Sequence, residues 1–320
     1  MANQETQILD EIIVSNRRKM LALGGAALAG LAFAGVTSAS AQSAAPTDAD
    51  VLNFALNLEY LEANFYNLAV SGQTIDQLGI GIGAGTAATG GGAVTTKPGG
   101  PTACKVAFAL PQVKAYAIET AAEESKHVTL LRSALSTSAV AQPPIDLYNS
   151  FNTLGALIGV PNFDPFASDA FFLVGAYIFE DVGVTAYSGA AGLISTNSTL
   201  VTAAGILAVE AYHAGLVRTT IFQVDPTNSA GYLGITQKIS ALRNKLDLSA
   251  TPDDYGIMAT VTALNGTNVI GGGYSVVDAN LTTSLAFSRT TSQVLAIVTG
   301  GTAGAYKGVF FPSGLNGNVK

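Results

Sequence analysis

The sequence has 320 residues, of which 48% are hydrophobic and 12% are charged, and its formal net charge is −7. This hydrophobic fraction excludes a disordered chain, and the acidic balance, with only 15 Lys and Arg, excludes a typical nucleic-acid partner. A single cysteine excludes an internal disulfide framework and a cysteine-rich metal site. The length suffices for one large core with appendages or for two small domains.

The first 41 residues have the three parts of an export signal. Arg17 and Arg18 resemble the twin-arginine export motif, residues 21–36 form an apolar run, and residues 39–41 (Ala-Ser-Ala) offer a cleavage site. The alternative is a membrane anchor, but the apolar run of about 16 residues is shorter than the roughly 20 that a spanning helix needs. We therefore expect residues 1–41 to be removed on export to the periplasm or beyond it by the twin-arginine route. The mature chain should have no stable membrane span.

Four later segments have the apolar spacing of long amphipathic helices. They cover residues 48–70, 111–135, 168–193 and 198–223. Each is longer than the roughly 12 residues of an average globular helix. Caps are expected at Thr47 or Asp48, at Ser168, and at Asn197 or Ser198. Four such helices predict an all-α protein with a four-helix bundle over residues 42–225.

Two long connections and a tail surround these helices. Residues 72–103 contain 10 glycines and two charged residues, which predicts an irregular surface insertion. Residues 136–167 contain four prolines and are expected to form the crossover between two helix pairs. In the tail, residues 226–320, helices are expected near 232–246 and 292–298. We expect this tail to pack on the bundle rather than to form a domain of its own.

The acidic residues of the expected mature chain are concentrated on the four helices. All seven of its glutamates lie there, and both of its histidines follow a glutamate by three residues, as Glu124-x-x-His127 and Glu210-x-x-His213. Residues three apart share a helix face, with Cβ atoms about 5–6 Å apart, so a carboxylate and an imidazole can converge on one metal ion. The alternative is a pair of surface ion pairs, which the apolar surroundings of both motifs disfavour.

Each helix has at least one of these glutamates on its core seam, the positions that recur in alternating steps of three and four. The first helix has Glu59 and Glu62 there, and the third has Glu180. Several buried carboxylates are costly without compensating charge, and two divalent cations would neutralise them. We therefore expect a two-metal site. Glu119 and Glu123 lie off the seam and are expected to be solvated or to face the crossover.

The two halves of the bundle repeat one pattern. Glu59 precedes Tyr66 by seven residues, as Glu180 precedes Tyr187, and a Glu-x-x-His helix follows each pair. Without the Gly-rich insertion, the chain consists of two similar helix hairpins.

These features resemble the ferritin-like superfamily, in which single glutamates on two helices and Glu-x-x-His motifs on two others hold two iron or manganese ions. Asn57-Leu58-Glu59 followed by Tyr66 resembles the first helix of ferritins and rubrerythrins. Residues 52–63, 287–290 and 310–316 are similar to an exported ferritin-like family that includes plant desiccation-related proteins. The resemblance implies an up-down-down-up bundle, whereas the insertion and the long tail argue against a ferritin storage cage.

The resemblance also implies a role for each site residue. The six implied metal ligands are Glu59 and Glu180 as terminal ligands, Glu124 and Glu210 as bridges, and His127 and His213 with one on each metal. Glu62, one turn from Glu59, would be an additional ligand. Tyr66 and Tyr187 would hydrogen-bond the carboxylates and act as redox relays. Ordinary core packing with a satisfied hydroxyl is the alternative for both tyrosines.

The implied function is redox chemistry at an exported di-metal centre. Two iron ions per chain are the first expectation and manganese is the alternative, with O₂ or peroxide as the reactant. The reaction would be Fe(II) oxidation or peroxide removal in stress protection. A manganese catalase and a non-enzymatic scaffold for desiccation or stress protection remain the alternatives, and a homodimer remains open. Metal binding should weaken below about pH 6, because it needs ionised carboxylates and neutral imidazoles.

Overall fold

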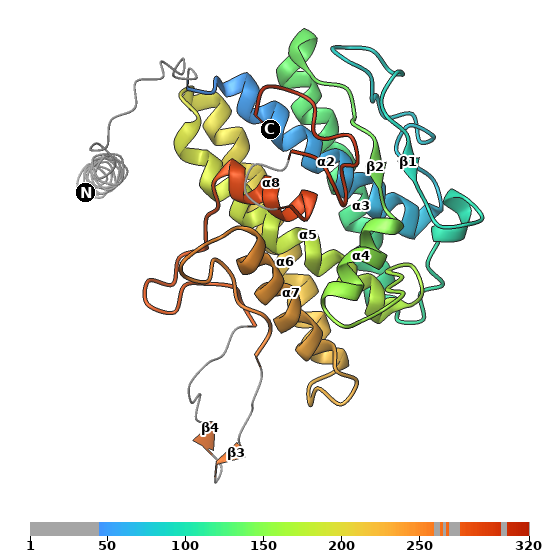
Figure 1. Cartoon of the computed structure of the whole chain (residues 1–320), viewed down its shortest axis with the longest axis vertical. Helices are drawn as coiled ribbons and strands as arrows, with labels where there is room; N and C mark the ends of the chain where they lie inside the picture. The colour runs from blue at the N-terminus through green and yellow to red at the C-terminus, as the bar shows by residue number, and fades with distance from the viewer. Residues whose placement is uncertain (1–44, 259–262, 265–266, 269–275, 302–305, 320) are drawn as a thin grey trace, which may run out of the picture. The chain divides into compact units, whose positions relative to one another are not determined.

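The computed structural model describes residues 45–258, 263–264, 267–268, 276–301 and 306–319 (Figure 1). The export signal expected at residues 1–41 lies outside these residues. The helices are α2 (Asp48–Ser71), α3 (Pro111–Leu135), α4 (Asn149–Leu157), α5 (Asp169–Ala190), α6 (Asn197–Val224), α7 (Tyr232–Leu246) and α8 (Thr291–Thr299). The strands are β1 (Val94–Thr95), β2 (Ile145–Asp146), β3 (Ala263–Leu264) and β4 (Thr267–Asn268), and the 3₁₀ helices are η1 (Pro101–Cys104), η2 (Ser136–Ser138) and η3 (Ala191–Leu193).

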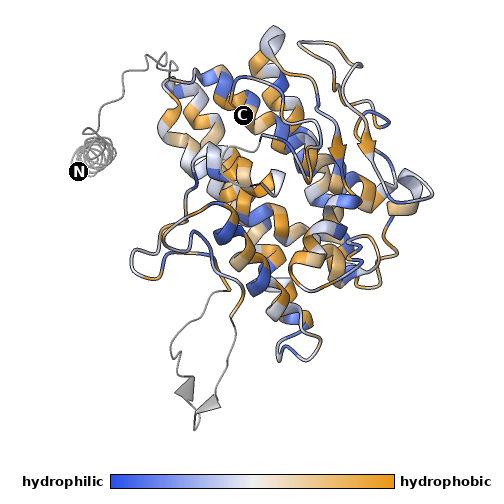
Figure 2. Ribbon diagram, viewed as in Figure 1, coloured by the Kyte–Doolittle hydropathy of each residue, from blue (hydrophilic) through white to orange (hydrophobic). Residues whose placement is uncertain are grey.

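Four long helices, α2, α3, α5 and α6, form the bundle, with α2 packed on α3 and α5 packed on α6 (Figure 1). Hydrophobic residues recur along all four (Figure 2), as expected for helices that bury one face in a shared core. The all-α fold class is therefore confirmed. The helices begin and end within a few residues of their expected positions, with η3 forming the last turn expected of the third helix.

Hydrogen bonds at the helix ends show the direction in which each helix runs. Asn53, near the start of α2, donates to a carbonyl of η2, directly after α3, so α2 and α3 are antiparallel. Asp169, at the start of α5, accepts from the backbone just before α3, so α3 and α5 start at the same end. Asp48, at the start of α2, accepts from the backbone N–H of Thr196, just before α6. The order is therefore up-down-down-up.

The caps of α2 and α5 are as expected, but the cap of α6 is not. Thr47 caps α2 in a capping box and Ser168 caps α5 through its side chain. The expectation of a cap at Asn197 or Ser198 is wrong, because α6 already begins at Asn197, after Thr196, without a side-chain capping bond. A carboxylate from α2 instead accepts from the backbone N–H of Thr196.

The two long connections are joined to each other and contain more structure than expected. β1 of the insertion pairs in parallel with β2 of the crossover. The crossover also contains α4, which was not expected. Its first turn is stabilised by Asp146, whose carboxylate accepts from the backbone N–H groups of Tyr148 and Asn149 at 2.9 and 2.7 Å. Phe151 of α4 is fully buried.

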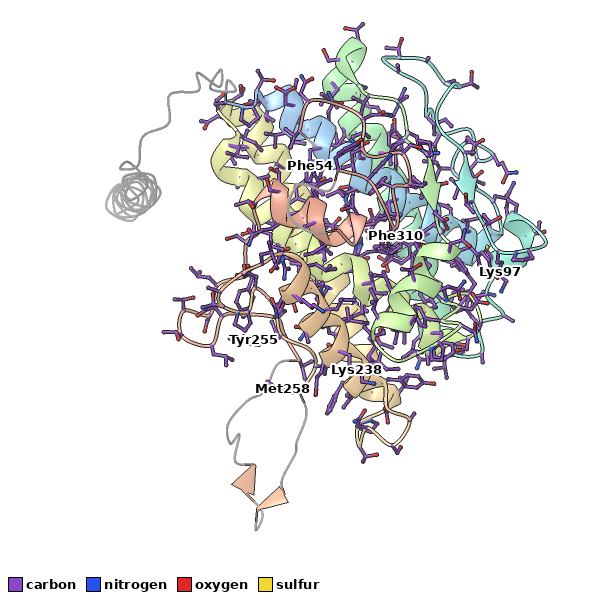
Figure 3. The ribbon with its side chains drawn as sticks, in the orientation of Figure 1. Phe54, Lys97, Lys238, Tyr255, Met258 and Phe310 are labelled. Carbon is purple, nitrogen blue, oxygen red and sulfur yellow. The ribbon has the colours of Figure 1, made fainter. Side chains whose placement is uncertain are left out.

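The described part of the tail lies against the bundle. α7 and α8 contact α5, and the backbone N–H of Arg289 donates to the carbonyl of Thr185 at 2.9 Å. Phe310, labelled in Figure 3, packs its ring against Phe151 and Phe179, with centroids 5.3 and 5.0 Å away. The tail therefore shares the aromatic core of the bundle.

A buried ion-pair network also connects the tail to the bundle. Its three arginines and three aspartates are all at most 6% exposed. The pairs are Asp181 with Arg218 (2.8 Å) and Arg243 (3.1 Å), Asp254 with Arg243 (2.9 Å) and Arg289 (2.8 Å), and Asp247 with Arg289 (2.8 Å). The network therefore links α5 and α6 of the bundle to α7 and to the segments that follow α7.

Among the described residues, two helical stretches are long and apolar enough to span a membrane by length and composition, Asp169–Leu193 and Asn197–Val224. The most apolar part of the first is 89% buried inside the bundle, and that of the second is 33% buried. The core helix of a folded bundle meets the same criterion, so these stretches are weak indications of a membrane span.

Candidate metal centre

The middle of the bundle contains the six residues implied as metal ligands. α2 and α5 contribute one glutamate each, whereas α3 and α6 contribute one Glu-x-x-His motif each. All six are at most 7% exposed: Glu59, Glu124, His127, Glu180, Glu210 and His213. The core seam read from the sequence thus faces the interior on every helix.

These six residues form two overlapping groups, in each of which one ligand atom per residue lies within 4.8 Å of all the others. Position A consists of Glu59, Glu124, His127 and Glu210. Position B consists of Glu124, Glu180, Glu210 and His213. Glu124 and Glu210 belong to both positions, while each position has one glutamate and one histidine of its own. This arrangement is the one found where helix bundles bind two neighbouring metal ions through shared carboxylates.

Both histidines turn Nδ1 toward the carboxylates. Nδ1 of His127 lies 3.3 Å from Glu59 Oε2 and 3.4 Å from Glu124 Oε2. Nδ1 of His213 lies 3.1 Å from Glu124 Oε1 and 3.4 Å from Glu180 Oε2. Nδ1 is therefore the imidazole nitrogen that each position presents to a metal ion.

Eight buried side-chain atoms of the centre have no hydrogen-bond partner among the described residues. They are Glu59 Oε2, both carboxylate oxygens of Glu124, Glu180 Oε2, both carboxylate oxygens of Glu210, and Nδ1 of His127 and of His213. Buried polar atoms are nearly always paired, because an unpaired one keeps its full desolvation cost. Carboxylate oxygens and imidazole nitrogens are ligands of iron and manganese. These residues therefore fit a pair of such ions.

Two tyrosines donate hydrogen bonds to the carboxylate oxygens of Glu59 and Glu180 that are not part of positions A and B. The hydroxyl of Tyr66 on α2 donates to Glu180 Oε1 on α5. The hydroxyl of Tyr187 on α5 donates to Glu59 Oε1 on α2. Each tyrosine thus orients the glutamate of the opposite hairpin and leaves its Oε2 for a ligand.

Glu62 is buried beside the centre but belongs to neither position. Burial, together with the charges of Glu124 and Glu180, raises its pKa well above the ordinary value. Glu62 therefore keeps its proton to a higher pH than an ordinary glutamate does. The structure brings it close to the site without placing it among the six converging side chains.

The electrostatics of the centre favour protons where metal ions are absent. Burial and the charge of Glu124 raise the pKa of Glu59 to about 7, and burial with the surrounding carboxylates raises that of Glu210 well above its usual range. Burial alone would raise the pKa of Glu124, but the imidazoles of His127 and His213 lower it to about 2. Burial alone would lower the pKa of His127, but Glu124 and Glu59 raise it to about 11. Metal binding must displace these protons.

Two features of the site were missed by sequence reasoning, and the first is Gly183 on α5. A Cβ atom at this residue would lie 2.1 Å from Glu210 Oε2, far inside van der Waals contact. Gly183 therefore leaves the space that the shared carboxylate of Glu210 occupies. The sequence signal was a glycine three residues after Glu180, on the same helix face.

The second missed feature is Glu123 on α3. The expectation that it is solvated or faces the crossover misses its main contact: the side chain is 35% exposed, but its Oε2 lies 2.7 Å from Nε2 of His213 on α6. Glu119, one turn earlier, is exposed as expected. The contact depends on how α3 packs against α6, which residue spacing within one helix cannot give.

Comparison with known proteins finds a family whose match includes the residues of this site. The model of a family described as the ferritin-like domain matches residues 47–223. The desiccation-related protein PCC13-62 of Craterostigma plantagineum is 31% identical over 281 residues, which cover 85% of this chain and 83% of that protein. The ferritin-like catalase Nec2 of Nesocodon mauritianus is 26% identical over 282 residues, covering 85% and 84%. No solved structure matches at a significant level.

Proposed function

This chain belongs to the ferritin-like domain family, and on that premise we propose that it binds two redox-active metal ions at positions A and B. Iron is the first candidate and manganese the second, because oxygen and imidazole ligands suit both. The observation that carries the proposal is the sharing of Glu124 and Glu210 by two groups whose ligand atoms all converge within 4.8 Å.

The side chains of the centre would divide the work between them. Glu59 and His127 would bind one ion, Glu180 and His213 the other, and Glu124 and Glu210 both. Tyr66 and Tyr187, which donate to Glu180 and Glu59, keep those carboxylates in place and lie close enough to pass electrons or protons. Burial of all six ligands keeps bulk water away from the reacting atoms.

We propose that the bound ions exchange electrons with O₂ or peroxide, which is the chemistry that a pair of iron or manganese ions supplies. The first candidate reaction is oxidation of Fe(II), with O₂ or peroxide reduced. The second is disproportionation of two H₂O₂ to two H₂O and one O₂, which the name of one relative, a ferritin-like catalase, favours. Either reaction suits a stress-protection role, which the name of the desiccation-related relative supports.

The test is to load the protein anaerobically with Fe(II) or Mn(II) and to measure peroxide-dependent O₂ evolution and Fe(II) consumption. O₂ evolution identifies a catalase, and Fe(II) consumption without it identifies an oxidase. E124A should abolish both activities and two-metal binding while helicity by circular dichroism is retained, whereas E119A, at an exposed site of the same helix, should change neither. A metal-free scaffold would show neither activity, and its melting temperature would not respond to chelation.

We also propose export by the twin-arginine route, on the sequence of residues 1–41. Replacing both Arg17 and Arg18 by Lys should keep the precursor uncleaved in the cytoplasm of an expressing bacterium. Cleaved protein in the periplasm from this variant would contradict the proposal.

A further inference from the structure

We propose that Glu123 is a positioning residue that makes the two metal positions unequal, so that position B binds its ion more tightly than position A. This inference rests on the two-metal function proposed above. It concerns a residue outside both groups of converging ligands, and one observation in the outer environment of the two histidines carries it.

At position B, the histidine is held from both sides. Nδ1 of His213 faces Glu124 and Glu180 at 3.1 and 3.4 Å. Its other nitrogen, Nε2, lies 2.7 Å from Oε2 of Glu123. A carboxylate can only accept a hydrogen bond, so Nε2 carries the proton and the lone pair of the neutral ring lies on Nδ1, toward the metal position.

At position A, the inner contacts are alike but the outer one is missing. Nδ1 of His127 faces Glu59 and Glu124 at 3.3 and 3.4 Å. Within the part of the chain that the structure describes, no hydrogen bond is made to Nε2 of His127. Nothing in this part of the chain therefore selects the ring form that presents a lone pair on Nδ1.

The internal repeat identifies the residue responsible. Glu124 and His127 correspond to Glu210 and His213, so Glu123, one residue before Glu124, corresponds to Val209, one residue before Glu210. Glu123 reaches from α3 to the histidine on α6, and by the same correspondence Val209 is the residue of α6 that stands in the place of Glu123. The two hairpins repeat the proposed ligands but not this carboxylate. The groups that face the metal positions are therefore symmetric, whereas the groups around the outer histidine nitrogens are not.

Such an outer carboxylate matters for metal affinity. A ligating histidine that donates its second N–H to a carboxylate is fixed in ring form and orientation, and loss of such a partner typically lowers metal affinity about 10- to 100-fold. Position B should therefore load first, and position A should hold the more readily exchanged ion.

The experiment compares the positions one at a time, because repulsion between two cations would separate the two binding steps even in a symmetric site. H127A leaves position B complete and H213A leaves position A complete. Mn(II) affinity is measured in each by competition with a chelator, and the Mn(II) electron paramagnetic resonance spectrum reports the environment of the bound ion. We expect H127A to bind its one ion about 10- to 100-fold more tightly than H213A.

Three further substitutions assign the difference to the outer carboxylate. E123V should weaken binding about 10- to 100-fold in the H127A protein and leave the H213A protein unchanged. V209E should strengthen binding in the H213A protein, a gain that misfolding cannot produce. E123Q should retain most of the affinity of the H127A protein, because its amide oxygen still accepts a hydrogen bond from Nε2.

Equal affinities of H127A and H213A, or an E123V effect that is absent or the same in both, would overturn the inference and leave the proposed function standing. Loss of affinity in E123Q as large as in E123V would overturn the argument from ring form. Failure of the otherwise unsubstituted protein to bind two Mn(II) or Fe(II) ions per chain would instead overturn the proposed function, and this stoichiometry is measured first.

Discussion

Gly183 leaves room for a carboxylate of the candidate metal centre because it has no side chain. Its neighbour in space is the carboxylate of Glu210, which belongs to both metal positions. Within a helix, glycine is less favourable than alanine by about 0.5–1 kcal/mol, so local helix stability favours alanine at residue 183. The place of glycine here follows from the site, not from the helix.

We predict that G183A displaces Glu210 and reduces bound metal below two ions per chain, while helicity stays unchanged. The added methyl group would lie 2.1 Å from Glu210 Oε2, so the carboxylate must move. The matched control is G205A on α6, where a Cβ meets no atom within 4 Å. That control should keep both ions and gain up to about 1 kcal/mol of stability. Two ions per chain in G183A would contradict the assigned role of this glycine.

At the scale of the helices, the bundle brings together glutamates from four helices, whose carboxylates repel one another when they are ionised. Burial raises the pKa of Glu59 to about 7, and raises those of Glu62 and Glu210 well above the ordinary value. In the unfolded chain these groups ionise near their usual 4.5. Folding of the metal-free chain therefore retains protons that unfolding releases, and its stability must depend on pH.

We predict that the metal-free protein loses stability as the pH rises from 5 to 8. A group whose pKa is higher in the folded state than in the unfolded state stabilises the fold. This stabilisation is complete at pH values below the unfolded-state pKa and is lost as the pH rises through the folded-state pKa. The raised pKa of His127, about 11, acts in the same direction above pH 6.5. Metal affinity should change in the opposite sense and rise over this range, because binding displaces the protons that Glu59 and His127 hold.

The measurement is the melting temperature between pH 5 and pH 8, with chelator and with saturating Mn(II). The gap between the two curves should widen as the pH rises. A chelated protein whose melting temperature stays flat or increases over this range would be inconsistent with buried, proton-retaining carboxylates.

The long helices could be predicted from the sequence, because each has a strong periodic pattern over more than 20 residues. The convergence of the six side chains could be predicted as well, since i, i+3 spacing and the core seam both lie within single helices. α4 and β1 could not, because a nine-residue helix and a two-residue strand depend on contacts from distant segments. Glu123 was missed for the same reason, since its partner His213 lies 90 residues away.

At the scale of the whole molecule, the tail is joined to the bundle by buried charges as well as by aromatic packing. Arg289 is 1% exposed and pairs with Asp247 and Asp254, each at 2.8 Å. Removing one member of a buried ion pair leaves the charge of its partner buried without a compensating charge, which is strongly destabilising. The tail should therefore contribute to the stability of the bundle that holds the centre.

We predict that R289A lowers the free energy of unfolding by about 3–5 kcal/mol. The matched control is K97A, which removes a partly exposed pair with Asp164 and should cost no more than about 1 kcal/mol. Both values come from denaturant unfolding of the metal-free proteins. Equal, small effects would mean that the tail packs without stabilising the bundle.

The central claim is that the four helices hold two metal ions per chain. It is tested most directly by elemental analysis of the protein purified without added metal, followed by anaerobic reconstitution with Fe(II) or Mn(II). The account predicts about two ions per chain, of iron or manganese. A chain that carries neither metal, and that takes up fewer than two ions on reconstitution while fully folded, would contradict it.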